Sequence, residues 1–134
     1  MSSIENKGKV IYLDNAATTP MSPKVINVIT DEMKNDFGNA SSTYELGRKA
    51  RNVIDKARHQ IAESINAKDG EIIFTSGGSE SNNTAIFGTA YSRKNSGKKI
   101  ITTKIEHPSV LNPMKRLEQE GYNIVYLDVD ETGH

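Results

Sequence analysis

Apolar residues recur at intervals of three and four along four stretches of the chain, with polar residues between them. This spacing predicts amphipathic helices, because it places the apolar side chains on one helix face. The stretches cover residues 23–35, 44–66, 79–93 and 109–120. Ser22 and Pro23 are start signals for the first helix, because serine is a common N-cap residue and proline a common first helical residue. The charges in residues 44–66 fall away from the apolar stripe, which is typical of a solvated helix face.

Short runs rich in β-branched and apolar residues lie between these helices and predict strands. They cover residues 10–13, 72–74, 99–103 and 123–128. The run Ile72, Ile73, Phe74 is typical of a buried strand. From residue 72 onward strands and helices alternate, which favours right-handed crossovers and parallel pairing. The sequence therefore predicts an α/β fold: a mainly parallel sheet with flanking helices.

The turn between the predicted strand at 72–74 and the helix that follows is made of small polar residues and two glycines. Glycine lets a ligand approach the main chain closely, and the first amides of a helix attract anions. A phosphate could therefore bind over Gly78 and Ser79. The same residues also suit a capped turn that binds nothing, and the turn by itself favours that interpretation.

His107 follows the predicted strand at 99–103, so it lies at the same edge of the sheet as the Gly78 turn. Ligands of parallel sheets bind beyond the carboxyl ends of the strands. A histidine before a proline is commonly structural or exposed, yet an imidazole at this edge could stack on a flat ring or transfer protons near neutral pH. A ring that carries a phosphate would use both features.

Composition narrows the classes of partner. Lys plus Arg and Asp plus Glu each number 17, so no net charge draws in nucleic acid or an anionic membrane. The chain has no cysteine, which excludes disulfides, thiolate metal sites and a cysteine nucleophile within it, and we expect no metal site. A chain of 134 residues fits one domain. Neither a signal peptide nor a long apolar span is found, which predicts a cytoplasmic protein.

Four motifs, in order along the chain, resemble those of the NifS/IscS-type cysteine desulfurases. They are YLDNAATT at residues 12–19, FGNASS at 37–42, FTSGGSESNN at 74–83 and EHPS at 106–109. That family belongs to the class V aminotransferase group of fold-type I pyridoxal phosphate enzymes. The resemblance implies that residues 22–134 are the N-terminal part of a large pyridoxal phosphate-binding domain, preceded by an N-terminal segment and substrate-side loop at 1–21.

The resemblance also implies residue roles. Gly78 and Ser79 would bind the phosphate of pyridoxal 5'-phosphate, and His107 would lie over its ring and act as a catalytic residue. Family members often have alanine where this chain has Gly78 and threonine where it has Ser79. Ser79 keeps the hydroxyl group of that threonine. Asn15 and Ala16 would lie near the substrate. The loop at 37–42 would be structural or lie near a dimer partner.

The reaction implied by the resemblance converts L-cysteine to L-alanine and passes the sulfur to a protein cysteine as a persulfide, for iron–sulfur cluster or thio-cofactor assembly. The expected partners are L-cysteine, a sulfur-acceptor protein and a second copy of the chain. The family's Schiff-base lysine, its aspartate and its cysteine lie downstream of the matching region, so we expect these 134 residues to be inactive by themselves. The motifs also suit a class V aminotransferase, a selenocysteine lyase or a non-catalytic interaction module.

Overall fold

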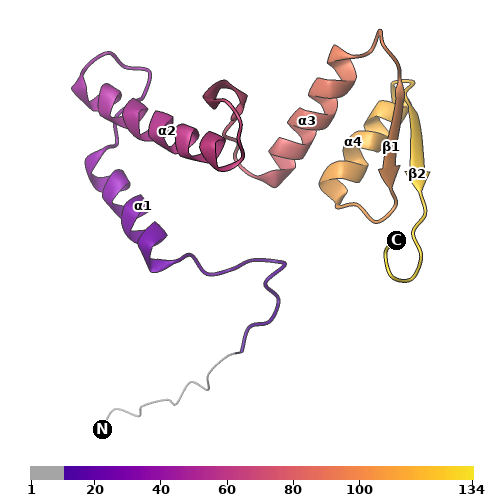
Figure 1. Ribbon diagram of the computed structural model, residues 1–134, viewed down its shortest axis with the longest axis horizontal. Coiled ribbons are helices and arrows are strands. Elements are labelled where there is room, and N and C mark those ends of the chain that lie inside the picture. The colour runs from indigo at the N-terminus through magenta and orange to yellow at the C-terminus, as the bar shows by residue number, and fades with distance from the viewer. Residues whose placement is uncertain (1–10) are drawn as a thin grey trace. The chain divides into compact units, whose positions relative to one another are not determined.

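The computed structural model describes residues 11–134, which divide into two compact units. The first unit ends at Ile72 and the second spans Ile73–His134 (Figure 1). None of the helices in residues 11–134 combines the length and the apolar character needed to cross a membrane.

The first unit is helical. It contains α1 (Pro23–Asn35), α2 (Glu45–Ser64) and the short 3-10 helix η1 (Asp69–Glu71). As predicted, α1 begins at Pro23, and the Ser22 hydroxyl accepts a hydrogen bond of 3.3 Å from the N–H of Val25. This bond satisfies one of the amides that the first helical turn leaves without a partner.

Two glycines pack the loop at 37–42 against the start of α2. A Cβ atom on Gly47 would overlap the carbonyl oxygen of Ser42, and one on Gly38 would overlap the backbone of Leu46. Only glycine allows so close a backbone approach. The loop motif therefore has a structural use within this unit.

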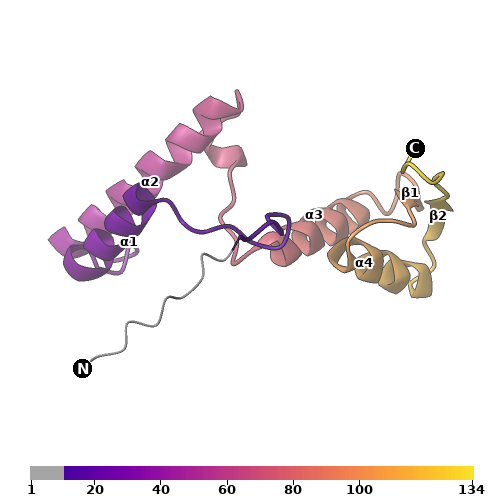
Figure 2. The ribbon, with the colours of Figure 1, turned by 90° about the horizontal axis from the view of Figure 1, so that it is seen from below.

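The second unit is an α/β unit. Its elements are α3 (Gly78–Ser92), β1 (Lys99–Thr103), α4 (Pro108–Gln119) and β2 (Asn123–Leu127). The two strands pair in parallel, from Lys99 opposite Asn123 to Thr103 opposite Leu127, and α4 is the crossover between them (Figure 2). This arrangement confirms the predicted α/β class with parallel strands and flanking helices.

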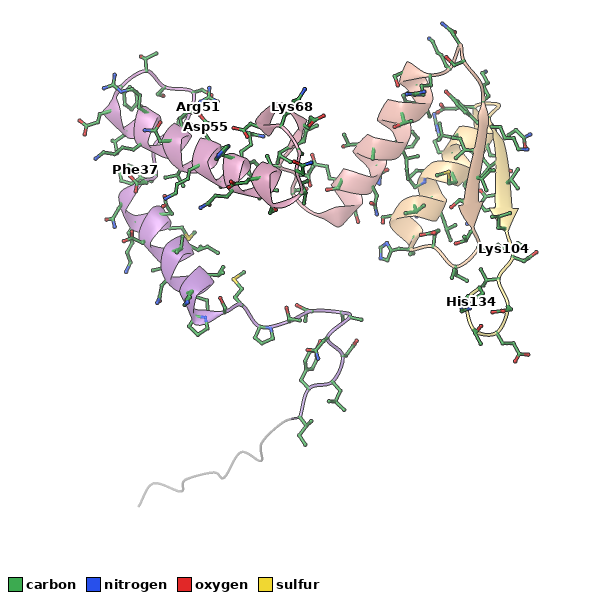
Figure 3. The ribbon with its side chains drawn as sticks, in the orientation of Figure 1. Phe37, Arg51, Asp55, Lys68, Lys104 and His134 are labelled. Atoms are coloured by element: carbon green, nitrogen blue, oxygen red, sulfur yellow. The ribbon has the colours of Figure 1, made fainter. Side chains whose placement is uncertain are left out.

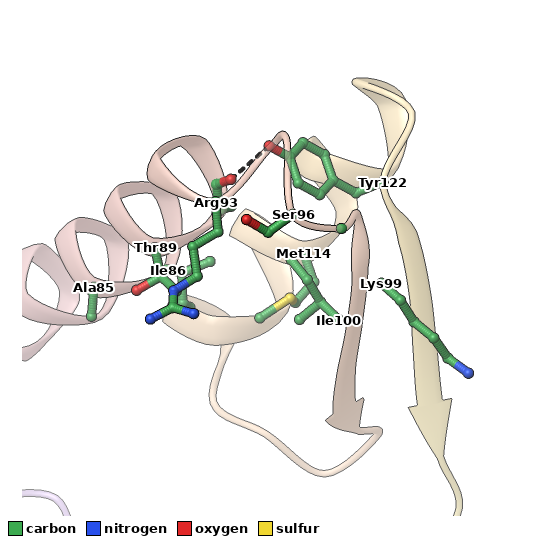
Figure 4. Close-up of a pocket in the computed structure, with 11 residues that line it drawn as sticks. Ala85, Ile86, Thr89, Arg93, Ser96, Lys99, Ile100, Met114 and Tyr122 are labelled. Carbon is green, nitrogen blue, oxygen red and sulfur yellow. Dashed lines mark hydrogen bonds between the residues drawn. The ribbon is translucent and has the colours of Figure 1, made fainter.

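The core of the second unit lies between its two helices and β2. It consists of Ala90, Met114, Leu117, Tyr122 and Ile124, with Leu117 fully buried. The Tyr122 hydroxyl donates a hydrogen bond of 2.9 Å to the carbonyl oxygen of Ala90 in the last turn of α3 (Figure 4). Helix ends leave such carbonyls without intrahelical donors, so this bond completes the end of α3.

Two predicted strands are wrong. Ile72, Ile73 and Phe74 form no strand, and Ile73 and Phe74 are 72% and 48% exposed. Residues 11–13 form none either, and Val10 lies outside the described residues. A strand needs a partner for its backbone N–H and C=O groups, and within residues 11–134 only β1 and β2 pair.

Candidate functional site

The predicted phosphate turn is the start of α3. Gly77 is its N-cap residue, in an extended conformation and without a side-chain cap. The N–H groups of Gly78 and Ser79 belong to the first helical turn, which has no intrahelical acceptor for them. A Cβ atom on Gly77 or Gly78 would meet no other atom within 4 Å. The backbone here is therefore open to a ligand that accepts hydrogen bonds.

Side chains of the turn hold its shape. The Glu80 carboxylate accepts hydrogen bonds from the hydroxyl and the N–H of Ser76, both at 2.6 Å. These bonds, the one from the Ser76 hydroxyl first, lower the pKa of Glu80. The Thr75 and Ser81 hydroxyls are 2.6 Å apart. The glutamate is thus bonded to the amide of Ser76 and leaves the amides of the first helical turn open.

His107 is the N-cap of α4, one residue before the helix begins at Pro108. Its Nδ1 accepts a hydrogen bond of 3.1 Å from the N–H of Ser109 and lies 2.8 Å from the Ser109 hydroxyl. The Asn82 side chain of α3 donates a bond of 2.8 Å to that same hydroxyl. This bond ties α3 to the first turn of α4.

One pocket of about 470 Å³ brings two of the predicted residues together. Ser79 of α3 and His107 of the β1–α4 connection both line it. The other lining residues are Asn83, Phe87, Pro108, Ser109, Asn112, Pro113 and Arg116. Gly78 does not line the pocket, although its N–H precedes that of Ser79 at the same helix start.

The sequence interpretation gave no site role to four polar residues of this pocket, Asn83, Ser109, Asn112 and Arg116. The Asn83 side chain donates a bond of 2.8 Å to the carbonyl oxygen of Ser79. Helical spacing could have found Asn83, because residues four apart share one face of a helix. Asn112 likewise lies four residues after Pro108 on α4, and both line the pocket.

The predicted substrate-side residues lie in the first unit. Asn15 and Ala16 are exposed and sit in a turn that the bond of 3.2 Å from Ala17 N–H to the Asp14 carbonyl oxygen closes. Their role toward a substrate stays a prediction.

Two other features of the second unit contain none of the predicted residues. A pocket of about 470 Å³ between α3, β1 and α4 has a largely apolar surface to which Ile86 and Met114 contribute, with Arg93 at its border (Figure 4). At the carboxyl end of β1, the Lys104 ammonium pairs with the Asp128 carboxylate at 2.6 Å (Figure 3). Among residues 11–134 no three His, Asp or Glu side chains are grouped as metal ligands.

Known proteins match nearly the whole chain in sequence. The family model described as Aminotransferase class-V matches residues 11–134. A cysteine desulfurase IscS of Dictyoglomus turgidum is 50% identical over 123 residues, which cover 92% of this chain and 31% of that protein.

Solved structures agree with the sequence match. A NifS-like protein superposes with a TM-score of 0.83 at 33% identity, covering 87% of this chain and 32% of the other. SspA in complex with cysteine gives a TM-score of 0.80 at 40% identity, over 87% of this chain and 33% of the other. The chain spans about a third of the length of the curated relatives it matches. With a family model matched from residue 11 to residue 134, the chain belongs to the class V aminotransferase family.

Proposed function

We propose that this chain supplies the phosphate- and ring-binding part of a pyridoxal phosphate-dependent cysteine desulfurase. The observation that carries the proposal is that Ser79 and His107, which come from separate elements, line one pocket. Relatives that share up to half of the sequence are named cysteine desulfurases, which favours this activity over others in the family.

The residues present fit the cofactor. A pocket of about 470 Å³ is within the usual size range of small-molecule sites. The Ser79 hydroxyl and the amides at the start of α3 are donors where helix geometry favours a phosphate. The open space over Gly78 leaves room for that group. The imidazole of His107, in the same pocket, has a flat face on which an aromatic ring can stack.

Bound pyridoxal phosphate supplies an electron sink for carbanion chemistry at the α-carbon of an amino acid. Ser79 and the neighbouring amides bind the phosphate and fix the ring position. His107 covers the ring and moves a proton at Nε2, the nitrogen that does not bond to Ser109. The reaction also needs a thiol that accepts sulfur, and these 134 residues contain no cysteine, so we propose that the thiol lies outside them.

The proposal includes the partners of the whole enzyme: L-cysteine as substrate, a sulfur-acceptor protein that serves iron–sulfur cluster or thio-cofactor assembly, and a second copy of the chain, in the cytoplasm. Self-association is supported by the apolar residues that α1 and the loop after it expose, among them Val28, Met33 and Phe37. It is also supported by the outer edges of the two-stranded sheet, which have no strand partner among residues 11–134.

The cofactor site can be tested on this chain with pyridoxine 5'-phosphate. This ligand keeps the ring and the phosphate but has no aldehyde, so it cannot react with surface lysines. In amide-resolved NMR we expect saturable shifts at Gly78, Ser79 and His107. Unphosphorylated pyridoxine should bind more weakly and inorganic phosphate should compete, since the phosphate provides the main contact.

Ser79→Ala should weaken binding of pyridoxine 5'-phosphate by roughly 2- to 10-fold, because one hydrogen bond to the phosphate is lost. Ser92→Ala is the matched control, since Ser92 is an exposed serine of the same helix whose hydroxyl donates to the carbonyl oxygen of Thr89. Equal binding of pyridoxine with and without its phosphate, or equal affinity of Ser79→Ala and the wild type, would refute the assignment.

The activity itself is tested with L-cysteine in the full-length protein that contains this chain, by measuring sulfide and alanine with excess dithiothreitol present, which reduces the persulfide and releases its outer sulfur as sulfide. Under these conditions the desulfurase proposal requires both products in equal amounts. Release of selenide from selenocysteine with no sulfide from cysteine would assign a selenocysteine lyase instead. Transfer of the amino group to an oxo acid would assign an aminotransferase.

A further inference from the structure

A cluster of three side chains joins α3 to the start of α4. The Asn82 amide nitrogen is 2.8 Å from the Ser109 hydroxyl, which in turn is 2.8 Å from Nδ1 of His107. Asn82 and Ser109 are half-buried, whereas His107 is exposed. The cluster lies at the border of the pocket that Ser79 and His107 line.

The hydrogen atoms in this cluster can be placed by counting donors and acceptors. The Asn82 amide nitrogen only donates, so the Ser109 oxygen accepts its hydrogen bond and keeps its own hydrogen for another partner. The nearest acceptor is Nδ1 of His107. The backbone N–H of Ser109 also points at this Nδ1, from 3.1 Å. Two donors therefore face one ring nitrogen, which has to be the unprotonated one.

We propose that Asn82 and Ser109 are positioning residues that hold neutral His107 in the Nε2–H tautomer. Moving the proton to Nδ1 would place it against the N–H of Ser109, so that two donors would face each other. The neutral imidazole thus presents an N–H to the pocket and donates to an acceptor atom of the ligand. The tautomer follows from the hydrogen bonds, and only its use toward a cofactor rests on the proposed function.

The tautomer is measured directly by histidine-selective ¹⁵N NMR on the 134-residue chain near pH 9, far above the ordinary histidine pKa of ~6.5. The chemical shifts of the two ring nitrogens give the ratio of Nε2–H to Nδ1–H. His107→Gln identifies the signals of His107 among those of the three histidines. We expect the wild type to be almost entirely Nε2–H at His107.

Ser109→Ala removes the hydroxyl but keeps the backbone N–H, and should lower the tautomer ratio by roughly fivefold, the effect of one hydrogen bond. Ser109→Thr keeps the hydroxyl and should restore the ratio. Asn82→Asp replaces the donor with an acceptor that competes with His107 for the Ser109 hydrogen, so the ratio should also fall. Ser92→Ala, elsewhere on α3, should leave the ratio unchanged.

A ratio in Ser109→Ala and Asn82→Asp equal to that of the wild type would overturn the proposal. Amide spectra of each variant show whether α4 is intact, and Asn82→Asp carries the test if Ser109→Ala disturbs the helix. The measurement contains no cofactor. A chain that fails to bind pyridoxine 5'-phosphate but shows the expected ratios would refute the proposed function and leave this inference standing.

Discussion

Three tyrosines of the second unit differ in how their hydroxyl groups are bonded. The Tyr122 hydroxyl is buried and donates to the Ala90 carbonyl oxygen at 2.9 Å. The Tyr126 hydroxyl is buried without a hydrogen-bond partner among the described residues, and burial raises the pKa of that phenol. The Tyr91 hydroxyl donates to the Glu120 carboxylate at 3.0 Å in a residue that is 46% exposed. Replacing each tyrosine in turn by phenylalanine removes one hydroxyl group, and the environment of that group differs among the three.

The expected effects differ in sign as well as size. The N–H of Lys94, which in a longer helix would bond to Ala90, bonds to Tyr91 instead, so the Ala90 carbonyl depends on Tyr122. Tyr122→Phe leaves this buried acceptor unsatisfied and should lower the free energy of unfolding by about 1–3 kcal/mol. Tyr126→Phe removes a buried hydroxyl that bonds to nothing described here, and should raise the free energy of unfolding by about 1 kcal/mol.

Tyr91→Phe is the matched control. The Glu120 side chain is 29% exposed and keeps its ion pair with Arg116, so water can replace the phenol and we expect no measurable change. Amide hydrogen exchange of the core residues Leu117 and Ile124 reports the opening of this unit separately from the first. The reasoning would be refuted if Tyr122→Phe and Tyr91→Phe had equal effects, or if Tyr126→Phe destabilised the unit as much as Tyr122→Phe.

Three further predictions concern the core, the loop at 37–42 and the cofactor turn. Leu117→Ala should cost about 2–5 kcal/mol in urea unfolding, since the side chain is fully buried, and a cost below that of Val28→Ala on exposed α1 would contradict the packing. Gly47→Ala should lower the melting temperature of the first unit by forcing a Cβ atom against Ser42, whereas Gly70→Ala, which meets no atom within 4 Å, should not. The lowered pKa of Glu80 implies stability that is fully present above its ordinary value of 4.5 and is lost as pH falls through the lowered value. Glu80→Gln should therefore reduce α3 stability in thermal circular dichroism at pH 7 but not at pH 2, and an equal reduction at both would exclude the charge as the cause.

Local patterns predicted most of the fold. The cap at Ser22 and the spacing of apolar residues gave the position of α1, and the runs at 99–103 and 123–128 gave β1 and β2 to within a residue. Such features depend on near neighbours in the chain. The run Ile72, Ile73, Phe74 shows the limit, because a strand forms only with a partner, and local sequence does not contain that partner.

The candidate site was also predictable only in part, because some of its contacts join residues far apart in the chain. Ser79 and His107 were expected at one edge of a parallel sheet. The strand expected before Ser79 does not form, yet both residues line one pocket. The bond from Asn82 to Ser109 joins residues 27 positions apart, and no periodic pattern marks such a pair. His107 was predicted to precede the helix, but its role as the N-cap depends on a side-chain rotamer that the sequence does not specify.

The parallel pair of strands and its crossover helix are contiguous in the chain, between Lys99 and Leu127. Pairing β1 with β2 across α4 requires no residue of the first unit, and contacts between residues close in the chain form faster than contacts between distant ones. During synthesis, then, β1, α4 and β2 can assemble as soon as Leu127 has left the ribosome. The rest of a longer polypeptide would meet a preformed β–α–β template, with the edges of its strands ready to pair with strands made later.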